Sequence, residues 1–213
     1  MAPSTVLQAS LFGATEPRID PDLAGLRRRH LGHGAWVDHL PGWVDGADEL
    51  FARVHAAGDW GQGTMEMYGE RVRQPRLTSW WAVDELGRGP FTGLEVLADV
   101  AAVLSRAYDV AFTSVGGNLY RDGRDSVAWH GDRIARDLPT STIAIVSLGA
   151  HRPFKLRPRG GGPSIDHRLG RGDLLVMGGS CQRTWQHTVP KVALAEGPRI
   201  SVTFRHAYPA TAR

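Results

Sequence analysis

The sequence contains little cysteine and no long apolar run, and each shortage excludes a class of protein. Its single cysteine, Cys181, cannot form an internal disulfide, which argues against a disulfide-stabilised secreted scaffold. No apolar stretch approaches the roughly 20 residues needed to cross a bilayer. The first residues also lack the charged-then-apolar pattern of a signal peptide. We therefore expect a reduced, cytoplasmic setting without membrane contact.

Lysine is also scarce. Lys155 and Lys191 are the only lysines among 25 basic residues, so arginine carries nearly all the positive charge. Guanidinium groups suit two-pronged contacts with phosphate or carboxylate, although a GC-rich coding sequence would enrich arginine as well. The net charge of +3 and the pI of about 9.4 favour contact with phosphate without demonstrating it.

The chain of 213 residues, 42% of them hydrophobic, is long enough for one well-buried domain and short for two. Residues 1–35 hold three prolines, an arginine run at 27–29 and little periodicity, which predicts an irregular N-terminal arm. The remainder, 36–213, is expected to be a single domain. No feature requires a second copy, so a monomer is expected.

Two segments have helical periodicity. In the first, Asp45 or Asp48 could cap a helix with the apolar stripe Ala47, Leu50, Phe51 and Val54. In the second, Thr92 and Glu95 have the spacing of a capping box and precede the stripe Leu94, Leu97, Ala101, Leu104 and Tyr108.

After Tyr108 the pattern changes to short apolar or alternating runs separated by glycine, proline and aspartate, which predicts strands. Such a series is typical of an antiparallel sandwich or jelly roll. The glycine-rich segment 157–163 predicts a hairpin loop. The predicted strands are 111–120, 142–148, 153–156, 173–177 and 199–205.

A candidate metal site begins at His130-Gly131-Asp132, because alternation on a strand would direct both ligand-type side chains to one face. Two histidines and one carboxylate form the facial triad of non-haem Fe(II) oxygenases. His187 is the candidate third ligand. The alternative is that both histidines are ordinary, partly buried residues.

The final predicted strand carries a candidate anion site. Alternation puts Arg199, Ser201, Thr203 and Arg205 on one face. Two arginines that point inward are costly to bury unless they meet anions, and a dicarboxylate would satisfy both. The alternative is a polar outer face of an edge strand.

These segments together resemble the AlkB family of Fe(II)- and 2-oxoglutarate-dependent dioxygenases, in the family's order, from about Gln74 to Arg205. The segments that carry the resemblance are N-L-Y-R-D-G at 118–123, D-S-V-A-W-H-G-D at 125–132, S-L-G-A at 147–150, G-D-L-L-V-M-G-G at 172–179, W-Q-H at 185–187 and P-R-I-S-V-T-F-R at 198–205.

The resemblance implies a mostly β fold with flanking helices (α+β), in which a double-stranded β-helix, or jelly roll, carries a nucleotide-recognition lid at about 60–91. It implies Fe(II) bound by His130, Asp132 and His187, with no further catalytic side chain. It further implies that Arg199 and Tyr120 hold the distal carboxylate of 2-oxoglutarate, with Asn118 and Arg205 near its metal-chelating end. Ser201 stands where the family has asparagine.

The resemblance also implies a reaction. Fe(II), 2-oxoglutarate and O2 would remove N-alkyl groups from bases of DNA, or of RNA, with release of succinate, CO2 and an aldehyde. Two alternatives stay open. One is the same chemistry on a substrate other than nucleic acid, and the other is a catalytically weak module that binds nucleic acid.

On the substrate side, the segment 68–81 combines arginines with aromatic residues, and a similar segment in the family covers the extruded base. Arginines can hold phosphates while an indole stacks on a flipped base. The predicted substrate contacts are Arg73, Arg76, Trp80, Trp81 and Arg133, and which tryptophan stacks is left open. Many members of the family have an acidic residue where this chain has Ile134, at a position that can meet the exocyclic group of the alkylated base, so base recognition is expected to differ here.

Near the N-terminus, the segment from Gln8 to Phe12 resembles the short peptides by which bacterial repair proteins bind the replication sliding clamp. Leu11 and Phe12 would be the apolar anchors of such a peptide. The alternative is that they pin the arm to the protein's own core.

Overall fold

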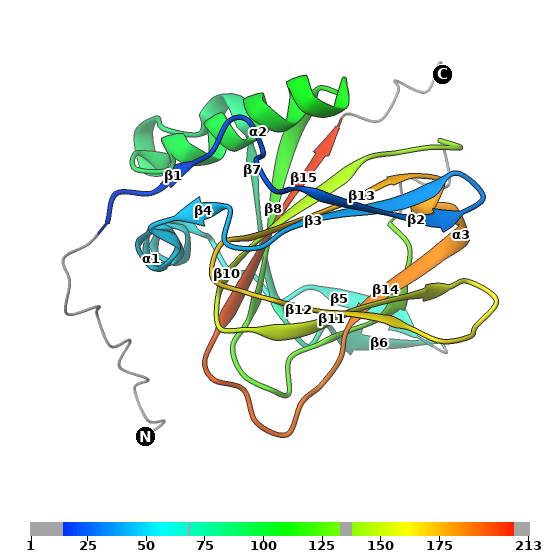
Figure 1. Ribbon diagram of the computed structural model, residues 1–213. Coiled ribbons are helices and arrows are strands. Elements are labelled where there is room, and N and C mark those ends of the chain that lie inside the picture. The colour runs from blue at the N-terminus through cyan, green and yellow to red at the C-terminus, as the bar shows by residue number, and fades with distance from the viewer. Residues whose placement is uncertain (1–14, 68, 133–137, 207–213) are drawn as a thin grey trace, which may run out of the picture.

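The computed structural model describes residues 15–67, 69–132 and 138–206, and two antiparallel sheets facing each other form its frame (Figure 1). The larger sheet has seven strands in the order β2-β3-β13-β10-β15-β8-β7, and the smaller has four in the order β12-β11-β14-β9. The strands of the larger sheet are β2 (Arg27–Gly32), β3 (Ala35–Leu40), β7 (Leu77–Ala82), β8 (Phe112–Tyr120), β10 (Ile143–Gly149), β13 (Asp173–Gly179) and β15 (Arg199–His206). Those of the smaller are β9 (Val127–His130), β11 (Arg152–Pro158), β12 (Ile165–Leu169) and β14 (Trp185–Val189).

Shorter elements surround this frame. Two strand pairs stand apart, β1 (Arg18–Ile19) with β4 (Val44–Asp45) and β5 (Thr64–Met67) with β6 (Glu70–Arg73). The helices are α1 (Ala47–Ala57), α2 (Glu95–Tyr108) and α3 (Cys181–Thr184), with 3-10 turns η1 (Val83–Glu85) and η2 (Gly89–Phe91). The five strands predicted after Tyr108 and the hairpin between 157 and 163 are confirmed.

The larger sheet separates two apolar cores. One core lies beneath α1 and α2 (Figure 1) and includes Ile200, Val202 and Phe204 of β15. The other lies between the sheets and includes Phe154 of β11 and Val189 of β14. Because side chains alternate along β15, its polar residues 199, 201, 203 and 205 face away from the helices, toward the smaller sheet. The prediction that they share an inward face is confirmed.

Both predicted helices form, but neither begins as expected. The apolar stripe of α1 is buried, and its N-cap is Gly46 at a φ of 67°, not Asp45 or Asp48. In the second helix, the Thr92 hydroxyl donates back to the carbonyl of Gly89, while the Glu95 carboxylate accepts from the N–H of Gly93. These local bonds build a turn that competes with the capping box, so α2 begins only at Glu95.

The predicted irregular arm is partly wrong. Residues 27–32 form β2, the edge strand of the larger sheet, and residues 18–19 form β1. Four of the six β2 residues are arginine or histidine, so an exposed edge strand shows no apolar alternation in the sequence. The boundary at residue 35 therefore does not separate an arm from the domain. Residues 1–14, including Gln8, Leu11 and Phe12, lie outside the described residues.

Candidate metal centre

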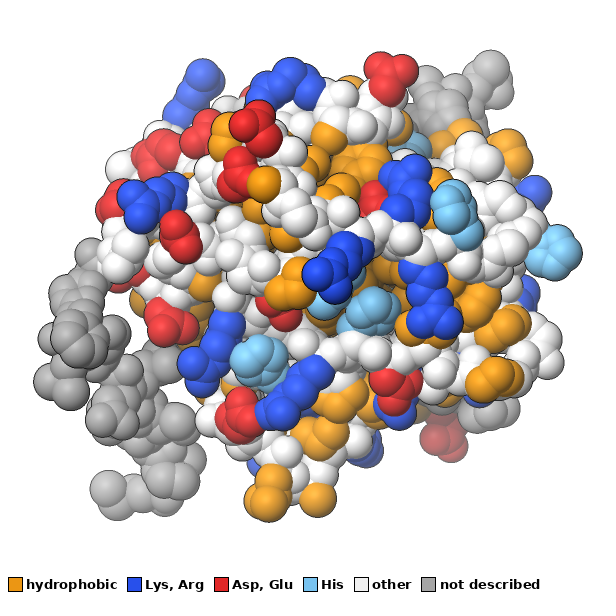
Figure 2. Space-filling view, viewed as in Figure 1, with side chains coloured by type: hydrophobic (Ala, Val, Ile, Leu, Met, Phe, Trp, Pro, Cys, Tyr) orange, Lys and Arg blue, Asp and Glu red, His pale blue; other side chains and the backbone are white. Residues whose placement is uncertain are grey.

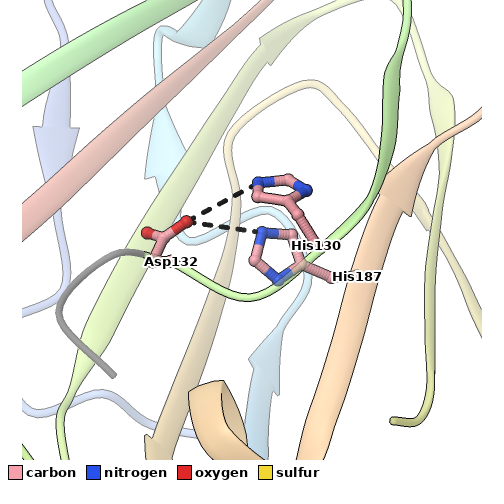
Figure 3. A group of neighbouring side chains, drawn as sticks. All are labelled: His130, Asp132 and His187. Atoms are coloured by element: carbon pink, nitrogen blue, oxygen red, sulfur yellow. Dashed lines mark ion pairs between the residues drawn. The ribbon is translucent and has the colours of Figure 1, made fainter. Parts of the chain in front are cut away.

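The three candidate metal ligands converge between the two sheets, at the smaller sheet's inner face (Figure 3). His130 ends β9 and lies opposite His187 of β14 in the register of the two strands. Asp132 was predicted to lie on the same strand as His130, but it follows the end of β9. Its Oδ1 is still 3.6 Å from His130 Nε2 and 3.8 Å from His187 Nε2. All three ligand atoms lie within 4.8 Å of one another, which is close enough to hold one metal ion.

Contacts around the imidazoles orient them for metal binding. The Nδ1 of His130 lies 2.8 Å from the carbonyl of Ala128, so Nδ1–H donates there and Nε2 keeps a free lone pair. The ring of His187 stacks on Phe154 at 5.4 Å between centroids. Burial, together with the charge of His130, lowers the pKa of His187 to about 3. His187 is therefore neutral at physiological pH, the form in which imidazole binds metals.

Asp132 is ionised and held from two directions. Burial alone would raise the pKa of its carboxyl, but the positive charge of Arg205 and the nearby histidines lower the pKa below its usual range. Arg205 donates to Asp132 Oδ2 through Nε at 3.1 Å and Nη2 at 3.0 Å, which leaves Oδ1 facing the histidines. The backbone N–H of Asp132 donates to Oε1 of the buried Gln182 at 2.9 Å.

The short helix α3 thus connects Asp132 with the strand that carries His187. Gln182 lies on α3, directly before the strand that carries His187. A Cβ at Gly131 would come within 2.3 Å of the Gln182 carbonyl oxygen, so only glycine allows the approach. Arg159 donates to the carbonyls of Gln182 and Arg183, which fixes α3 from the β11–β12 hairpin.

Arg199 forms a second polar site on the same inner face. Its side chain is fully buried, and among the described residues only the Ser147 hydroxyl accepts from it, at 2.7 Å from Nη2. Its Nε and Nη1 have no hydrogen-bond partner in the described chain. Burial lowers the pKa of Arg199 to about 10, so it stays charged at neutral pH. A buried cation with unpartnered N–H groups indicates a site for an anion.

The other predicted cosubstrate residues lie around Arg199. Tyr120 is opposite Arg199 in the register, and its ring centroid is 5.5 Å from the guanidinium carbon. Ser201 is buried on β15 beside Asn118 of β8. The side-chain carbonyl of Asn118 accepts from Nε of Arg76 at 2.9 Å. Arg76, predicted on the substrate side, therefore also connects the segment before β7 with the cosubstrate side.

Sequence reasoning gave no role to three further residues, Ser147, Gln182 and Arg152. A serine in the apolar run I-A-I-V-S-L-G was the available signal for Ser147, whereas nothing in the local pattern distinguishes Gln182. Arg152 is 1% exposed, and its guanidinium carbon lies 5.7 Å from the centroid of the Tyr120 ring. It donates to the backbone carbonyls of Asp122, Asp125 and Pro190, and so joins the turn after β8 to the end of β14.

The two tryptophans of β7 face opposite sides of the sheet, and this decides which of them is available to stack on a base. Trp81 is 3% exposed in the core beneath the helices, so the prediction that it is a candidate for stacking on a base is wrong. Trp80 is 62% exposed and alternates to the inner face, where Arg205 lies 5.1 Å from its ring. Gly116 makes room for this pair, since a Cβ there would approach both Trp80 and Arg205.

The remaining predicted substrate residues are less informative. Arg73 is exposed at the end of β6, in the β5–β6 hairpin within the expected lid. Arg133 and Ile134 lie outside the described residues.

These donors fit the metal and cosubstrate that the sequence implies. Two imidazole nitrogens and a carboxylate suit Fe(II) and leave coordination positions free. The unpartnered N–H groups of Arg199 suit a carboxylate of 2-oxoglutarate. Residues 39–205 match the model of the 2OG-Fe(II) oxygenase superfamily. The chain belongs to this superfamily. Fe(II), 2-oxoglutarate and O2 are therefore the metal and cosubstrates of its site.

Relatives of known name support the resemblance to AlkB proteins. The "Alpha-ketoglutarate-dependent dioxygenase alkB homolog 3" of Bos taurus is 34% identical, over 79% of this chain and 65% of that protein. The "DNA oxidative demethylase ALKBH2" of Arabidopsis thaliana is 32% identical, over 68% of this chain and 57% of that protein. The predicted AlkB resemblance is confirmed. The chain therefore spans less than two thirds of the length of either relative, 65% of the first and 57% of the second.

Solved structures confirm the jelly-roll fold. A prolyl hydroxylase from Trichoplax adhaerens, in complex with a peptide of hypoxia inducible factor, superposes with a TM-score of 0.61 at 15% identity, over 83% of this chain and 84% of that one. The structure titled OsALKBH1 superposes with a TM-score of 0.56 at 16% identity, over 85% of this chain and all of that one. No helix in the described part of the oxygenase is both long and apolar enough to cross a membrane.

Proposed function

We propose that this oxygenase removes alkyl groups oxidatively from N-alkylated bases in DNA, with RNA as the alternative nucleic acid. One observation carries the proposal. An exposed indole, Trp80, lies beside Arg205, which in turn contacts the metal-ligand candidate Asp132. A flat aromatic surface next to an oxidising centre suits an unstacked base. The relatives named as DNA oxidative demethylases support the same substrate class.

In this proposal His130, Asp132 and His187 hold Fe(II). Arg199, with Ser147 and Tyr120 beside it, binds the distal carboxylate of 2-oxoglutarate, and Asn118, Ser201 and Arg205 line the rest of its site. When bound, Fe(II), 2-oxoglutarate and O2 supply the oxidation that hydroxylates a carbon attached to nitrogen, after which the adduct separates into an aldehyde and the unmodified base. No protein nucleophile is required, because the cofactors carry the oxidation.

The protein residues then contribute orientation and charge. Arg205 keeps one oxygen of Asp132 engaged, so that the other faces the metal. Trp80 stacks on the extruded base and so holds the alkyl group toward the iron. Arg76, through Asn118, links base binding at β7 with cosubstrate binding at β8. The fully buried guanidinium of Arg199 binds carboxylate in a water-poor environment, where the charge pair is strong.

Formaldehyde release tests the proposal. Apoprotein is incubated anaerobically with Fe(II) and 2-oxoglutarate, oxygen is admitted, and aldehyde is measured with single-stranded DNA that carries 1-methyladenine or 3-methylcytosine. We expect iron-dependent release that His130→Ala abolishes. Succinate formation without release of aldehyde from any methylated oligonucleotide would contradict base dealkylation and leave the oxygenase chemistry intact.

Three partner and location predictions are also proposals. The segment containing Gln8, Leu11 and Phe12 is proposed to bind a replication sliding clamp. A clamp pull-down that is lost in the Leu11→Ala, Phe12→Ala double variant would support this contact, and equal retention would exclude it. A monomer and a cytoplasmic location are checked by light scattering and by cell fractionation.

A further inference from the structure

The edge of the larger sheet at β2 carries two charged side chains that have no partner in the described chain. Arg27 and Arg29 are exposed, and neither makes an ion pair or a hydrogen bond to a described residue through its side chain. We call these two residues the arginine ridge. Both arginines alternate to the inner side of the sheet, the side on which Leu31 of the same strand packs against the core between the sheets.

The strand beneath the ridge is held firmly. Arg28, which points the opposite way, donates to both oxygens of the buried Asp38, at 2.7 and 2.8 Å. Its guanidinium carbon lies 3.8 Å from the centroid of Trp36, and Tyr108 donates to the same carboxylate. Arg28 thus fixes β2 to the sheet, so Arg27 and Arg29 project from a rigid strand. Their side chains are separated by roughly 7 Å along it, the distance covered by two strand residues.

The titratable groups around the ridge are neutral or already paired. Beside the ridge, the ring of His39 on β3, which lies opposite Arg27 in the register, contacts the ring of His167 on β12, at 5.1 Å between centroids. The nearby carboxylates have other partners, since Asp166 pairs with Lys155 and Asp173 accepts from the N–H groups of Gly42 and Gly170. In Figure 2, arginine or lysine side chains lie beside histidines in the middle of this face, and most of the acidic side chains in view lie toward the helices. An anionic partner therefore meets little repulsion here.

The ridge is connected to the metal centre through α3. The β2–β3 hairpin contacts Ser180, whose hydroxyl donates to the His33 carbonyl at 2.6 Å. Ser180 directly precedes α3, and Gln182 of α3 accepts the N–H of Asp132. The hairpin that begins with β2 therefore contacts the segment that supports the metal-ligand candidates.

We propose that the arginine ridge binds backbone phosphates of the nucleic-acid strand, beyond the base that enters the active site. Two guanidinium forks on alternate residues suit successive phosphates of an extended strand. This inference rests on the proposed function for the identity of the polymer. It adds a contact remote from the reaction, which affects binding of long substrates and leaves the chemistry on short ones unchanged.

The test compares Arg27→Gln, Arg29→Gln with a matched control, Arg18→Gln, Arg106→Gln. The control removes the same charge from exposed arginines on and near α2, outside the expected lid, and thermal melting verifies that both variants are folded. Binding of a fluorescent single-stranded oligonucleotide of about 20 nucleotides is measured by anisotropy at several salt concentrations. Release of formaldehyde is measured in parallel with this oligonucleotide and with a trinucleotide carrying the same methylated base.

The ridge variant is expected to bind the long oligonucleotide about tenfold more weakly at low salt, with a salt-dependence slope reduced by roughly 1.4, or about 0.7 for each lost phosphate contact. Its turnover of the trinucleotide is expected to equal that of wild type and control. Equal affinity and equal slope in the ridge and control variants would overturn the proposal. Weaker binding by the ridge variant, in a protein that releases no aldehyde from any oligonucleotide, would support the ridge and reject base dealkylation.

Discussion

Two fully buried arginines lie near the ring of Tyr120, and their surroundings differ. Arg152 donates to three backbone carbonyls and leaves only Nε without a partner among the described residues. Arg199 donates to one hydroxyl and leaves both Nε and Nη1 unpartnered. Both side chains are removed from water to the same degree. The difference therefore lies in what the rest of the chain provides for each charge.

This contrast distinguishes a structural cation from a binding cation. A buried guanidinium whose N–H groups meet backbone oxygens holds segments together, whereas one with vacant N–H groups needs an external acceptor. Arg152 joins the turn after β8 to the end of β14, whereas Arg199 keeps N–H groups that could donate to the cosubstrate carboxylate proposed above. The four predictions below test this contrast, beginning with the largest expected effect.

Arg199→Met should weaken the binding of 2-oxoglutarate by about a thousandfold, or ~4 kcal/mol, because a buried charge pair with the carboxylate is lost. In the absence of cosubstrate, the free energy of unfolding should not decrease appreciably and is able to increase, because the substitution removes an unpaired buried charge. Titration calorimetry without oxygen and denaturant unfolding measure the two quantities. Affinity within threefold of wild type would show that Arg199 is not the anion site.

Arg152→Met should have the opposite profile. Three backbone carbonyls lose a charged donor, so the free energy of unfolding should fall by about 3 kcal/mol. The affinity of the folded fraction for 2-oxoglutarate should change less than tenfold. Arg152→Lys is the control, because it keeps the charge but lacks the planar fork that reaches several carbonyls. If Arg152→Met lost affinity without losing stability, the division between the two arginines would fail.

Much of this site was predictable because its residues recur in a fixed order that resembles a known family. The alternation in R-I-S-V-T-F-R predicts the inward face of β15, and H-G-D with W-Q-H predicts the three metal-ligand candidates. The roles of Arg152 and Gln182 were not predictable in this way. Their partners are backbone groups far away in the sequence, and a pattern of side-chain types contains no information on these.

The errors in the predicted helices and strands also arise from contacts that a pattern of side-chain types does not contain. Strand β2 was missed because an edge strand needs no apolar alternation, and its arginines resemble those of a charged loop. The choice between Trp80 and Trp81 needed the register of β7 against β8, which places one indole on each face. The start of α2 was decided by competing turns around Thr92, which capping preferences alone do not weigh.

Gln182→Leu extends the comparison to a buried amide that supports a metal ligand. Loss of the acceptor for the Asp132 N–H should reduce affinity for a divalent metal about tenfold, since orienting contacts of this kind contribute about tenfold to a hundredfold. Gln186→Leu, two positions before Thr188 on the outer face of β14, is the control and should leave metal affinity unchanged. Metal titration with Mn(II) in the absence of 2-oxoglutarate measures both variants. Equal affinity in the two would assign Gln182 a packing role only.

The smallest expected effect concerns two uncharged, partly buried groups, the imidazoles of His39 and His167, whose Nε2 atoms have no partner in the described chain. Burial, with a contribution from His39 and Arg29, lowers the pKa of His167 to about 4, and burial also lowers the pKa of His39. Asp166 and Asp173 oppose these shifts. The unfolded chain takes up these protons near the ordinary histidine pKa, so stability should fall as the pH drops from about 6.5 to about 4.

Since His167 is partly exposed, solvent screening limits its share of this loss to about 1 kcal/mol. His167→Leu should flatten the dependence of the melting temperature on pH over this range, whereas His33→Leu, at an exposed hairpin position, should not. A profile of the same steepness in wild type and His167→Leu would assign the acid sensitivity to other groups.

The pairing of β9 with β14, and of β15 with β8, has a consequence for how the protein is made. His130 is synthesised before His187, and Tyr120 before Arg199, so a growing chain acquires its last ligand and its anion site only when the later strand of each pair has been made. A chain that stops before β14 has two of the three ligands and no neighbouring strand to orient them. A chain in which β14 has not yet been made and paired therefore cannot assemble the full set of three metal-ligand candidates.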